Sequence, residues 1–297
     1  MDDESARFAL DTAWVRRSFD RAAAGFDAAA VLQTAVREQL LERLQLTALT
    51  PRIVLDAGAA TGHASGALKR RYPRARVLAV DSALGMLRAA ERQQSWRRRF
   101  DRIQADAERL PLPDASVDLI FSNLLLPWCD PERVFAEFRR VLAPHGLLTC
   151  SSLGPDTLRE LRIAWARVDA HSHVNQFIDM HDLGDALVRA GFAAPVLDVE
   201  RYTLKYKDVR GLAADLKAIG ARNFTAARSR GLTSRSKFLG MQDAYEAFRE
   251  GGRLPATYEV VFGQAWVPAE SSARRRGGAA SISVADLRRQ LPGRRTP

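Results

Sequence analysis

The fold of this chain is decided by residues 53–62, which read Ile-Val-Leu-Asp-Ala-Gly-Ala-Ala-Thr-Gly. The first three residues form a short apolar run of the kind found in a buried strand. Asp56 closes this run, and Gly58 and Gly62 bracket a turn whose backbone can approach a ligand closely, because glycine has no side chain. A helical pattern follows at 63–72. The stretch therefore predicts a strand, a glycine-rich turn and a helix.

The same rhythm continues through the middle of the chain. The expected strands are 53–55, 77–80, 102–105, 117–122 and 147–152, and the expected helices are 63–72, 83–94 and 131–142. Strands and helices that alternate at short spacing are typical of a parallel sheet with helices on both faces. We therefore predict an α/β fold with a Rossmann-like sheet.

The regions on either side of this core are expected to be less regular. Residues 1–48 are predicted to form an N-terminal helical cap, because apolar residues recur at helical spacing over 11–48. The main domain is expected to span 49–266, with an inserted cap at about 155–250. Residues 267–297 carry seven arginines and two acidic residues with little apolar content, so we expect a disordered basic tail. The later elements are predicted as helices at 155–168, 181–190, 209–219 and 237–249 and strands at 196–207 and 258–266.

Polar residues recur where the predicted strands end. Asp56, Asp81 and Asp106 each follow a strand, and Asn123 follows the fourth. In an open parallel sheet, ligands bind outside the carboxyl ends of the strands, where the strand order reverses. One such aspartate is often only a helix cap. Three of them in equivalent positions favour a ligand site.

The glycine-rich turn argues against a ligand that is bound through phosphates. A dinucleotide fingerprint needs a third glycine, where this chain has His63, and no Gly-Lys-Ser/Thr sequence of a P-loop is present. Asp81 lies 19 residues after Gly62, near the spacing expected of an acid that holds ribose hydroxyls. The pattern suits a cofactor that has a ribose but no phosphate.

As a set, these motifs resemble those of the class I S-adenosylmethionine-dependent methyltransferases. The resemblance is carried by 54–62, Asp81, 106–111, 118–123 and 142–148. It implies that S-adenosylmethionine is the cofactor and that Gly58 and Gly62 shape the pocket for its methionine part. The candidate cofactor-binding residues are Phe26, Asp56, Gly58, Gly62, Asp81, Asp106, Ala107 and Asn123.

The resemblance also implies individual roles. Asp56 would approach the ammonium of the cofactor and Asp81 its two ribose hydroxyls. Asp106 would meet the adenine amino group, and the Ala107 amide a ring nitrogen of the adenine. Ala60 departs from the family, which usually has a glycine at this position, so its methyl group is expected to lower cofactor affinity slightly.

A narrower resemblance covers almost the whole chain. The stretches 19–27, 151–161, 179–187 and 215–223 are similar to the biotin-pathway malonyl-acyl-carrier-protein O-methyltransferases. This similarity implies methyl transfer to the free carboxylate of malonyl-acyl-carrier protein early in biotin synthesis. Phe26 stands where the family often has Tyr and keeps a ring that can cover the cofactor. Assembly factors of respiratory complex I share several of these stretches, and methylation of quinones or other small molecules is a further alternative.

Esterification of a carboxylate makes modest demands on the protein. The nucleophile is ionised at pH 7, so no catalytic base is required and positioning is the main task. Arg159 is the candidate anchor for the carboxylate, because a guanidinium binds it in a bidentate fashion. A docking face for the acidic carrier protein is expected at Lys205, Lys207, Lys217 and Arg222. We expect no metal site, because no set of ligands has the spacing of one.

The composition of the chain limits which partners and which cellular location are expected. The chain has 297 residues and a net charge of +10, which favours an acidic partner. No nucleic-acid-binding motif is recognisable, so we expect no nucleic acid partner. No run of 18 apolar residues suggests a membrane span, and the acidic N-terminus is not a secretory signal. Together with only two cysteines, Cys129 and Cys150, these features predict a cytoplasmic protein.

Overall fold

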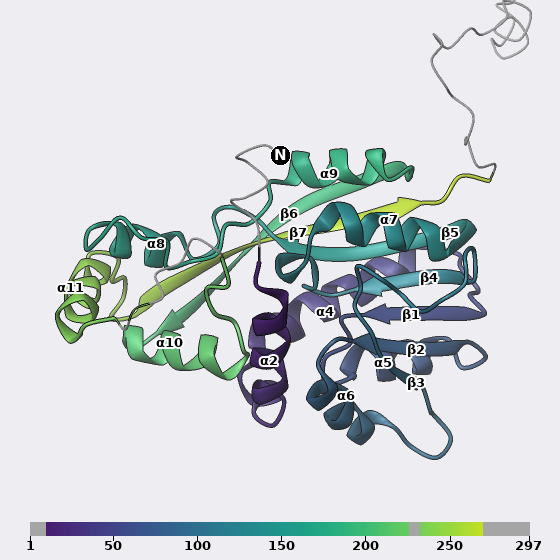
Figure 1. Ribbon diagram of the computed structural model, residues 1–297, viewed down its shortest axis with the longest axis horizontal. Helices are drawn as coiled ribbons and strands as arrows, with labels where there is room; N and C mark the ends of the chain where they lie inside the picture. Colours follow the sequence, from purple (N-terminus) through teal and green to yellow (C-terminus); the bar gives the residue numbers. More distant parts are fainter. Residues whose placement is uncertain (1–9, 226–230, 232, 270–297) are drawn as a thin grey trace, which may run out of the picture.

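The structure, a computed structural model, describes residues 10–225, 231 and 233–269. Seven strands form one sheet in the order β3-β2-β1-β4-β5-β7-β6 (Figure 1). Their bounds are β1 Ile53–Ala57, β2 Arg76–Asp81, β3 Asp101–Gln104, β4 Val117–Ser122, β5 Leu142–Leu153, β6 Ala193–Tyr206 and β7 Leu254–Trp266. Strands β1 to β5 are parallel, and β7 runs antiparallel to both β5 and β6. The predicted Rossmann-like α/β sheet is confirmed.

The predicted basic tail at 267–297 lies outside the described residues except for its first three positions.

Helices cover both faces of the sheet. One face is packed by α4 (Val31–Arg43) and α5 (His63–Arg71), and the other by α7 (Pro131–Val141) and α9 (Met180–Arg189). Helix α6 (Leu84–Ala90) contacts β2 and β3. Neighbouring residues of β4 show the alternation, because Ile120 packs toward α7 while Phe121 packs toward α4, and both are fully buried.

The strand order reverses at β1. The chain leaves β1 for β2 and β3 on one side and returns to β4 on the other, where β4 pairs with β1. The loops after β1 and β4 therefore diverge and leave a space at their carboxyl ends. In Figure 1, α2 (Thr12–Ala22) lies across this end of the sheet.

The N-terminal region is not one continuous helix. The structure divides it into α2, α3 (Phe26–Ala29), α4 and a final turn of 3-10 helix at Leu44–Leu46. The breaks fall at Gly25, which has no side chain to favour a helix, and at Ala30, whose ψ of 46° is not helical. These breaks turn Phe26 inward, where it is buried.

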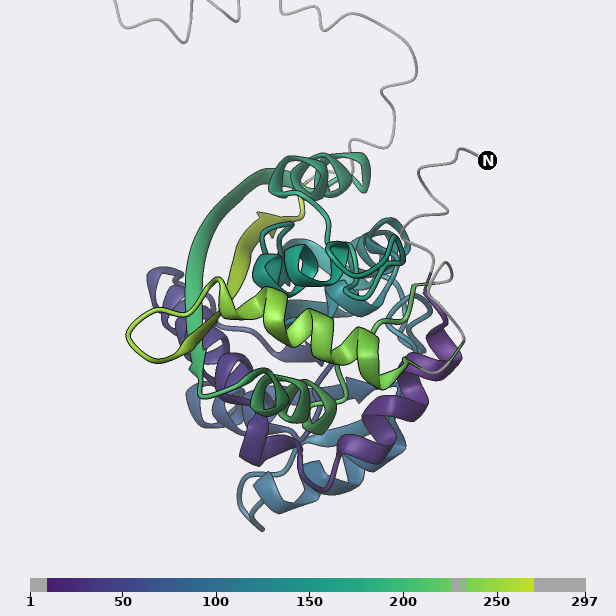
Figure 2. The same ribbon diagram turned by 90° about the vertical axis from the view of Figure 1, so that its left-hand side faces the viewer.

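A group of helices closes the carboxyl end of the sheet, as Figure 2 shows from that side. They are α8 (Arg159–Ala166), α10 (Val209–Ala218) and α11 (Arg235–Glu246). Helix α8 contacts both α11 and β7, and α10 contacts α3 and β6. These three helices fall within the insertion predicted at about 155–250. Strand β6 lies in the same range but belongs to the sheet, and α9 packs against it.

One helix boundary differs from its prediction for a clear reason. Helix α8 begins at Arg159, four residues after the predicted start at Pro155. Leu158 adopts a left-handed backbone with φ of 55°, and its amide donates to the carbonyl of Thr257 on β7, at 2.7 Å. This attachment to the sheet delays the helix. None of the helices in the described ranges is long and apolar enough to cross a membrane.

Candidate active site

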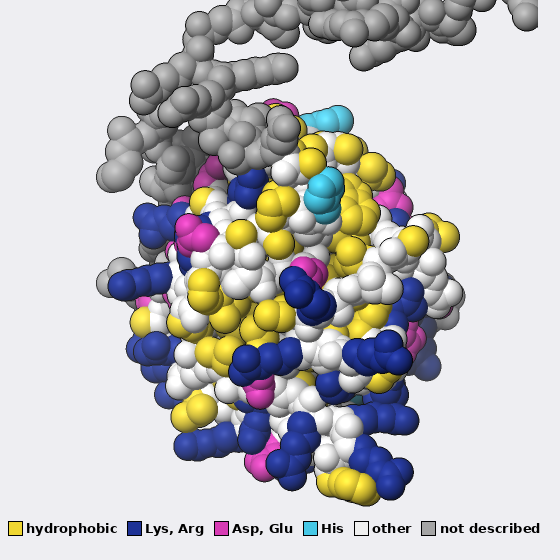
Figure 3. All heavy atoms as spheres, turned by 90° about the vertical axis from the view of Figure 1, so that its right-hand side faces the viewer, with side chains coloured by type: hydrophobic (Ala, Val, Ile, Leu, Met, Phe, Trp, Pro, Cys, Tyr) yellow, Lys and Arg dark blue, Asp and Glu magenta, His cyan; other side chains and the backbone are white. Residues whose placement is uncertain are grey.

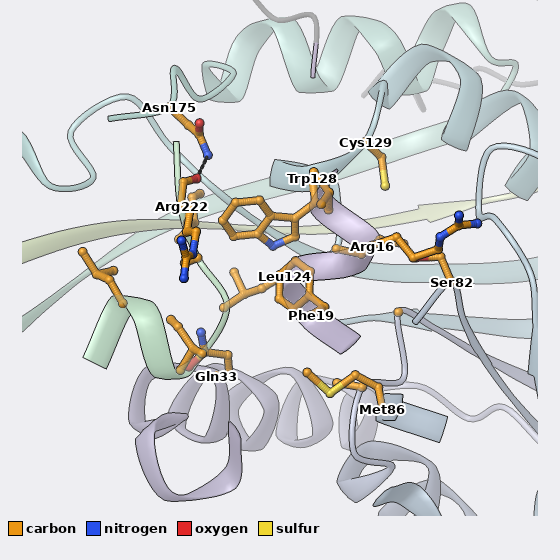
Figure 4. Close-up of a pocket in the computed structure, with 18 of the residues that line it drawn as sticks. Arg16, Phe19, Gln33, Ser82, Met86, Leu124, Trp128, Cys129, Asn175 and Arg222 are labelled. Atoms are coloured by element: carbon orange, nitrogen blue, oxygen red, sulfur yellow. Dashed lines mark hydrogen bonds between the residues drawn. The ribbon is translucent and has the colours of Figure 1, made fainter. Parts of the chain in front are cut away.

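A cavity of about 700 Å³ lies between the carboxyl ends of the strands and the capping helices. Its walls come from the glycine-rich turn, the ends of β2 and β4, α2, the start of α4, and the segment that follows α10. Figure 4 looks into this cavity. Its volume lies within the range of ligand sites in proteins, about 300–1,000 Å³.

The glycine-rich turn forms one wall, but its two glycines do different things. Gly58 lines the cavity with φ of 75°, and a Cβ atom there would lie 3.0 Å from the side chain of Leu125. Gly62 does not line the cavity. A Cβ atom at Gly62 would lie 2.7 Å from that of Ala90, so this glycine lets α5 pack closely against the end of α6. Only Gly58 is placed to contact a ligand.

Asp81 projects from the end of β2 into the cavity. One carboxylate oxygen accepts the amide of Ala60 at 2.9 Å and the other accepts the amide of Ala83 at 2.8 Å. Burial raises the pKa of Asp81 to about 6, while these two hydrogen bonds oppose the shift. The side chain is fixed, acidic and accessible from the cavity, as an acceptor for two hydroxyl groups must be.

Ala60, which stands where the family usually has a glycine, adopts a backbone conformation typical of glycine. Ala60 has φ of 45°, in the left-handed region that glycine adopts more easily, and its amide is the one that holds Asp81. Ala60 itself also lines the cavity. The turn therefore keeps its shape without the usual glycine, at the cost of local backbone strain.

Asp56 is placed behind the turn and not in the cavity. It is 1% exposed, and one carboxylate oxygen accepts the hydroxyl of Ser65 at 2.5 Å. Burial raises the pKa of Asp56 to about 7, against the effect of the Ser65 hydrogen bond. Its predicted contact with an ammonium group stays a prediction, because Asp56 is not among the residues that line the cavity.

Asp106 and Ala107 both line the cavity after β3, and their predicted contacts with an adenine stay predictions. Asp106 accepts the amide of Glu108 at 2.9 Å, which forms a tight turn and fixes the carboxylate at the rim. Met86 and Cys129 also line the cavity and give it apolar surface (Figure 4). Burial holds the pKa of Cys129 well above its usual value, so the thiol stays protonated and unreactive at neutral pH.

Asn123 also lines the cavity, but both ends of its side chain are engaged with the protein. The amide nitrogen donates to the carbonyl of Gln33 at 3.0 Å, and the oxygen accepts the hydroxyl of Ser151 at 3.1 Å. Asn123 therefore ties the start of α4 to the end of β4. Its predicted role in cofactor binding stays a prediction.

The N-terminal cover is fastened to the glycine-rich turn. Phe26 lines the cavity from α3. The next residue, Asp27, accepts the hydroxyl of Thr61 at 2.5 Å and pairs with Nε2 of His63 at 3.2 Å. These contacts hold the ring of Phe26 over the cavity.

The predicted carboxylate anchor, Arg159, lies outside the cavity. Arg159 is the first residue of α8, its side chain is 52% exposed, and it pairs with Glu160 at 3.3 Å without lining the cavity. The cations that line the cavity are Arg16, Lys217 and Arg222. The sequence analysis missed Arg16, although its spacing of three from Phe19 on one helix would have placed both on the same face.

Charge is divided between the walls of the cavity. The acidic residues Asp81, Asp106 and Glu108 lie at the sheet edge, whereas Arg16, Lys217 and Arg222 come from the capping segments. Within the part of the chain that the structure describes, none of these three cations forms an ion pair with a carboxylate. The cavity therefore offers acceptors on one side and free positive charge on the other.

Basic side chains are not confined to the cavity. Figure 3 shows the opposite end of the molecule, where Lys and Arg side chains are scattered over the face and acidic ones are fewer. A basic surface alone therefore does not locate a docking site on this protein. The cations that line the cavity are distinguished by their position.

Comparisons with known proteins agree with this geometry. A family model described as a methyltransferase domain matches residues 55–150. The chain is 55% identical to a malonyl-[acyl-carrier protein] O-methyltransferase of Methylovorus sp. strain MP688, over 88% of this chain and 90% of the relative. It is 52% identical to the enzyme of that name from Laribacter hongkongensis strain HLHK9, over 90% and 93%. The YcgJ protein from Bacillus subtilis shares the fold, with a TM-score of 0.56 and 18% identity over 78% of this chain and 98% of that one.

The sheet, the glycine-rich turn and the acids at the strand ends define the chain as a methyltransferase of the S-adenosylmethionine-dependent class. The match to whole relatives is more specific than the match to the domain. The chain belongs to the family of the malonyl-[acyl-carrier protein] O-methyltransferases.

Proposed function

We propose that this protein transfers a methyl group from S-adenosylmethionine to the free carboxylate of malonyl-acyl-carrier protein, a step early in biotin synthesis. The observation that carries the proposal is a cavity with carboxylates on its sheet wall and, on its capping wall, cations that form no ion pair among the described residues. The relatives that match about nine-tenths of the chain bear the name of this activity.

The residues present fit the cofactor. The carboxylate of Asp81 is held by two amides and keeps lone pairs for ribose hydroxyls, since each carboxylate oxygen accepts about two hydrogen bonds. The cavity wall beside it is apolar at Met86 and Ala107, which suits a flat aromatic base. When bound, the cofactor supplies an electrophilic methyl group on a sulfonium that departs as a neutral thioether.

The main task of the protein in this reaction is to align the two reactants. The acceptor carboxylate is ionised at neutral pH, so the reaction needs no side chain to remove a proton. Alignment of two reactants can contribute about 7–11 kcal/mol to the lowering of a barrier. Asp81 and the Gly58 turn hold one reactant, and Phe26 covers the cavity so that water is excluded.

The carrier protein would dock near the mouth of the cavity. Arg210 and Lys217 are both exposed and lie seven residues apart on α10, so they share one face of the helix. Of these two residues, Lys217 belongs to the docking face expected from the sequence, and Arg210 adds a second cation beside it. Lys205 and Lys207 lie at the end of β6, just before α10.

A cytoplasmic location completes the proposal. Both cysteines are free, with Cys150 buried and Cys129 partly buried, as expected of a protein kept under reducing conditions. The acyl-carrier substrate would be met in the same compartment. Fractionation of cells that express the chain, followed by detection of methyl-ester-forming activity, tests this location.

The substrate experiment compares three acceptors. Purified protein is incubated with S-adenosylmethionine and malonyl-acyl-carrier protein, acetyl-acyl-carrier protein or free malonate, and methyl esters are detected by mass spectrometry. We expect product with the malonyl carrier, none with the acetyl carrier, and little with free malonate. Growth of a biotin-requiring methyltransferase mutant that expresses the chain is the matching test in cells. Normal cofactor binding without product from the malonyl carrier would refute the proposal and favour a small-molecule acceptor or an assembly role.

A further inference from the structure

Two hydrogen-bond donors face one another in the cavity. The guanidinium of Arg222 points in from the segment after α10, and the amide of Gln33 points toward it from the start of α4 (Figure 4). These residues are 189 positions apart in the chain. Neither was identified in the sequence analysis as a group that recognises the reacting part of a substrate.

Each donor is held by an asparagine at its own backbone. The side-chain amide of Asn175 donates to the carbonyl of Arg222 at 3.0 Å, and that of Asn123 donates to the carbonyl of Gln33 at 3.0 Å. Asn175 is buried and also accepts the amide of Phe224 at 2.8 Å. The two segments that carry the donors are therefore fixed, although they come from opposite walls.

The donors lack an acceptor. Within the described residues, Arg222 has no carboxylate partner and the side chain of Gln33 has no hydrogen bond. The Oε1 atom of Gln33 is buried without a partner, so the nitrogen end of the amide is the end that faces the cavity. A positive charge and a neutral donor that point at one space define a site for an anion.

The surroundings strengthen this preference. Leu124 and Trp128 lie close to these donors in Figure 4, and Leu216 also lines the cavity, so all three contribute apolar surface. Charged hydrogen bonds are stronger where water is excluded. A guanidinium offers two parallel donors that match the two oxygens of a carboxylate.

We propose that Arg222 and Gln33 form the subsite that holds the acceptor carboxylate, with Asn175 and Asn123 as positioning residues. This inference rests on the proposed function. In the reaction, a carboxylate oxygen forms the new O–C bond, the S–C bond breaks, and sulfur keeps that electron pair as a thioether. The negative charge of the carboxylate disappears in the ester. Arg222 then loses its ionic partner, so the subsite favours substrate over product.

The test separates recognition of the carboxylate from recognition of the carrier. The variants are Arg222→Ala, Arg222→Lys and Gln33→Leu, with Arg159→Ala as a matched control, because Arg159 is an exposed arginine that does not line the cavity. For each variant we measure kcat/KM with malonyl-acyl-carrier protein and the Kd for S-adenosylhomocysteine. We also measure binding of malonyl-carrier and acetyl-carrier proteins in the presence of S-adenosylhomocysteine.

We expect Arg222→Ala to lower kcat/KM by about 10- to 150-fold, the range that corresponds to loss of hydrogen bonds to a charged group. Its binding preference for the malonyl over the acetyl carrier should fall by a similar factor, with S-adenosylhomocysteine affinity unchanged. Arg222→Lys should recover part of the loss, because an ammonium keeps the charge but not the paired donors. Gln33→Leu should show a smaller loss of the same kind, and Arg159→Ala none.

Three results would overturn the inference. Unchanged kinetics in Arg222→Ala would show that another group holds the carboxylate. Equal weakening of malonyl and acetyl carriers would assign Arg222 to carrier docking, and weaker S-adenosylhomocysteine binding would assign it to the cofactor site. Absence of ester with the unmodified protein would instead refute the proposed function, and this inference with it. If Arg222→Ala does not fold, Gln33→Leu decides, because it changes a different element of the fold.

Discussion

Replacement of Asp81 by alanine is the most direct test of the cofactor site. The carboxylate accepts two backbone amides, at 2.9 and 2.8 Å, and faces the cavity with its remaining lone pairs. Hydrogen bonds to charged groups contribute about 1.5–3 kcal/mol, so loss of the ribose contacts should raise the Kd for S-adenosylhomocysteine about 10- to 150-fold. Isothermal titration calorimetry at pH 8 measures this change.

The same variant also leaves the amides of Ala60 and Ala83 without their acceptor. An unpaired buried donor costs about 1–3 kcal/mol, and water in the cavity reaches these amides, so we expect a loss near 1 kcal/mol. The melting temperature should then fall by about 2–4 °C. Asp101→Ala is the matched control, because it removes an exposed carboxylate whose ion pair with Arg76 lies on the surface.

The pKa of Asp81 adds a second signature. Because burial raises this pKa to about 6, the carboxylate loses its charge as the pH falls from 8 to 5.5. Cofactor affinity of the unmodified protein should therefore fall over this window, whereas that of Asp81→Ala should not. An affinity within twofold of the unmodified protein at pH 8 would refute the assignment of Asp81 to the ribose.

Three further perturbations follow from the structure. Asp56→Asn should raise the free energy of unfolding at pH 8, by at most about 4 kcal/mol, because the pKa of this buried carboxyl is raised to about 7 and the charged form is the unfavourable one. The folded state binds more protons than the unfolded state between about pH 4 and 7, so this gain should shrink as the pH falls through 7, as urea unfolding at several pH values will show. Asp27→Ala should increase the dissociation rate of S-adenosylhomocysteine about 2- to 12-fold in stopped-flow experiments, since it releases α3 from Thr61; an unchanged rate would show that α3 does not cover the cofactor. Lys217→Glu should raise the KM for malonyl-acyl-carrier protein at low salt, and the difference should diminish at 0.5 M salt; a salt-independent effect would exclude electrostatic docking.

The sequence was sufficient for the elements whose signals are local. The strands ending at Asp81 and near Asp106 were predictable because each apolar run stops at a polar residue, and parallel strands bring their carboxyl ends together. The alternation over 196–207 predicted most of β6, but the first four residues of β7, Leu254 to Thr257, were not predicted. These four residues take strand form because they pair with 203–206 of β6, which lies about 50 positions away in the chain.

The candidate site shows the same difference between features set by local sequence and features set by long-range packing. Motif spacing placed Asp81 at the end of a strand, and that end lines the cavity. The spacing could not show that Asp56 lies behind the turn, because this position depends on the hydroxyl of Ser65, which reaches back from α5. Gln33 and Arg222 meet only after α4 and the segment beyond α10 have packed on the sheet. Arg159 carried the right chemistry for an anchor, but the left-handed backbone at Leu158 sets where its helix begins, and its side chain pairs outside the cavity.

The long antiparallel pair of β6 and β7 also determines which wall of the cavity is able to move. Beyond Leu153, where β5 ends, the two strands remain hydrogen-bonded to each other as far as Tyr206 and Leu254, so they extend past the rest of the sheet. Helix α8 contacts β7 and helix α10 contacts β6, so we expect this wall of the cavity to move together with the sheet. Helices α2 and α3 have no such backbone connection to the sheet. The start of α2 is tied to the segment after α10, because the amide of Asp11 donates to the carbonyl of Phe224 at 3.2 Å, and α3 is held by the contact between Asp27 and Thr61. Ligand entry therefore falls to the N-terminal segment, and its amides should exchange with solvent deuterium faster than those of 201–206.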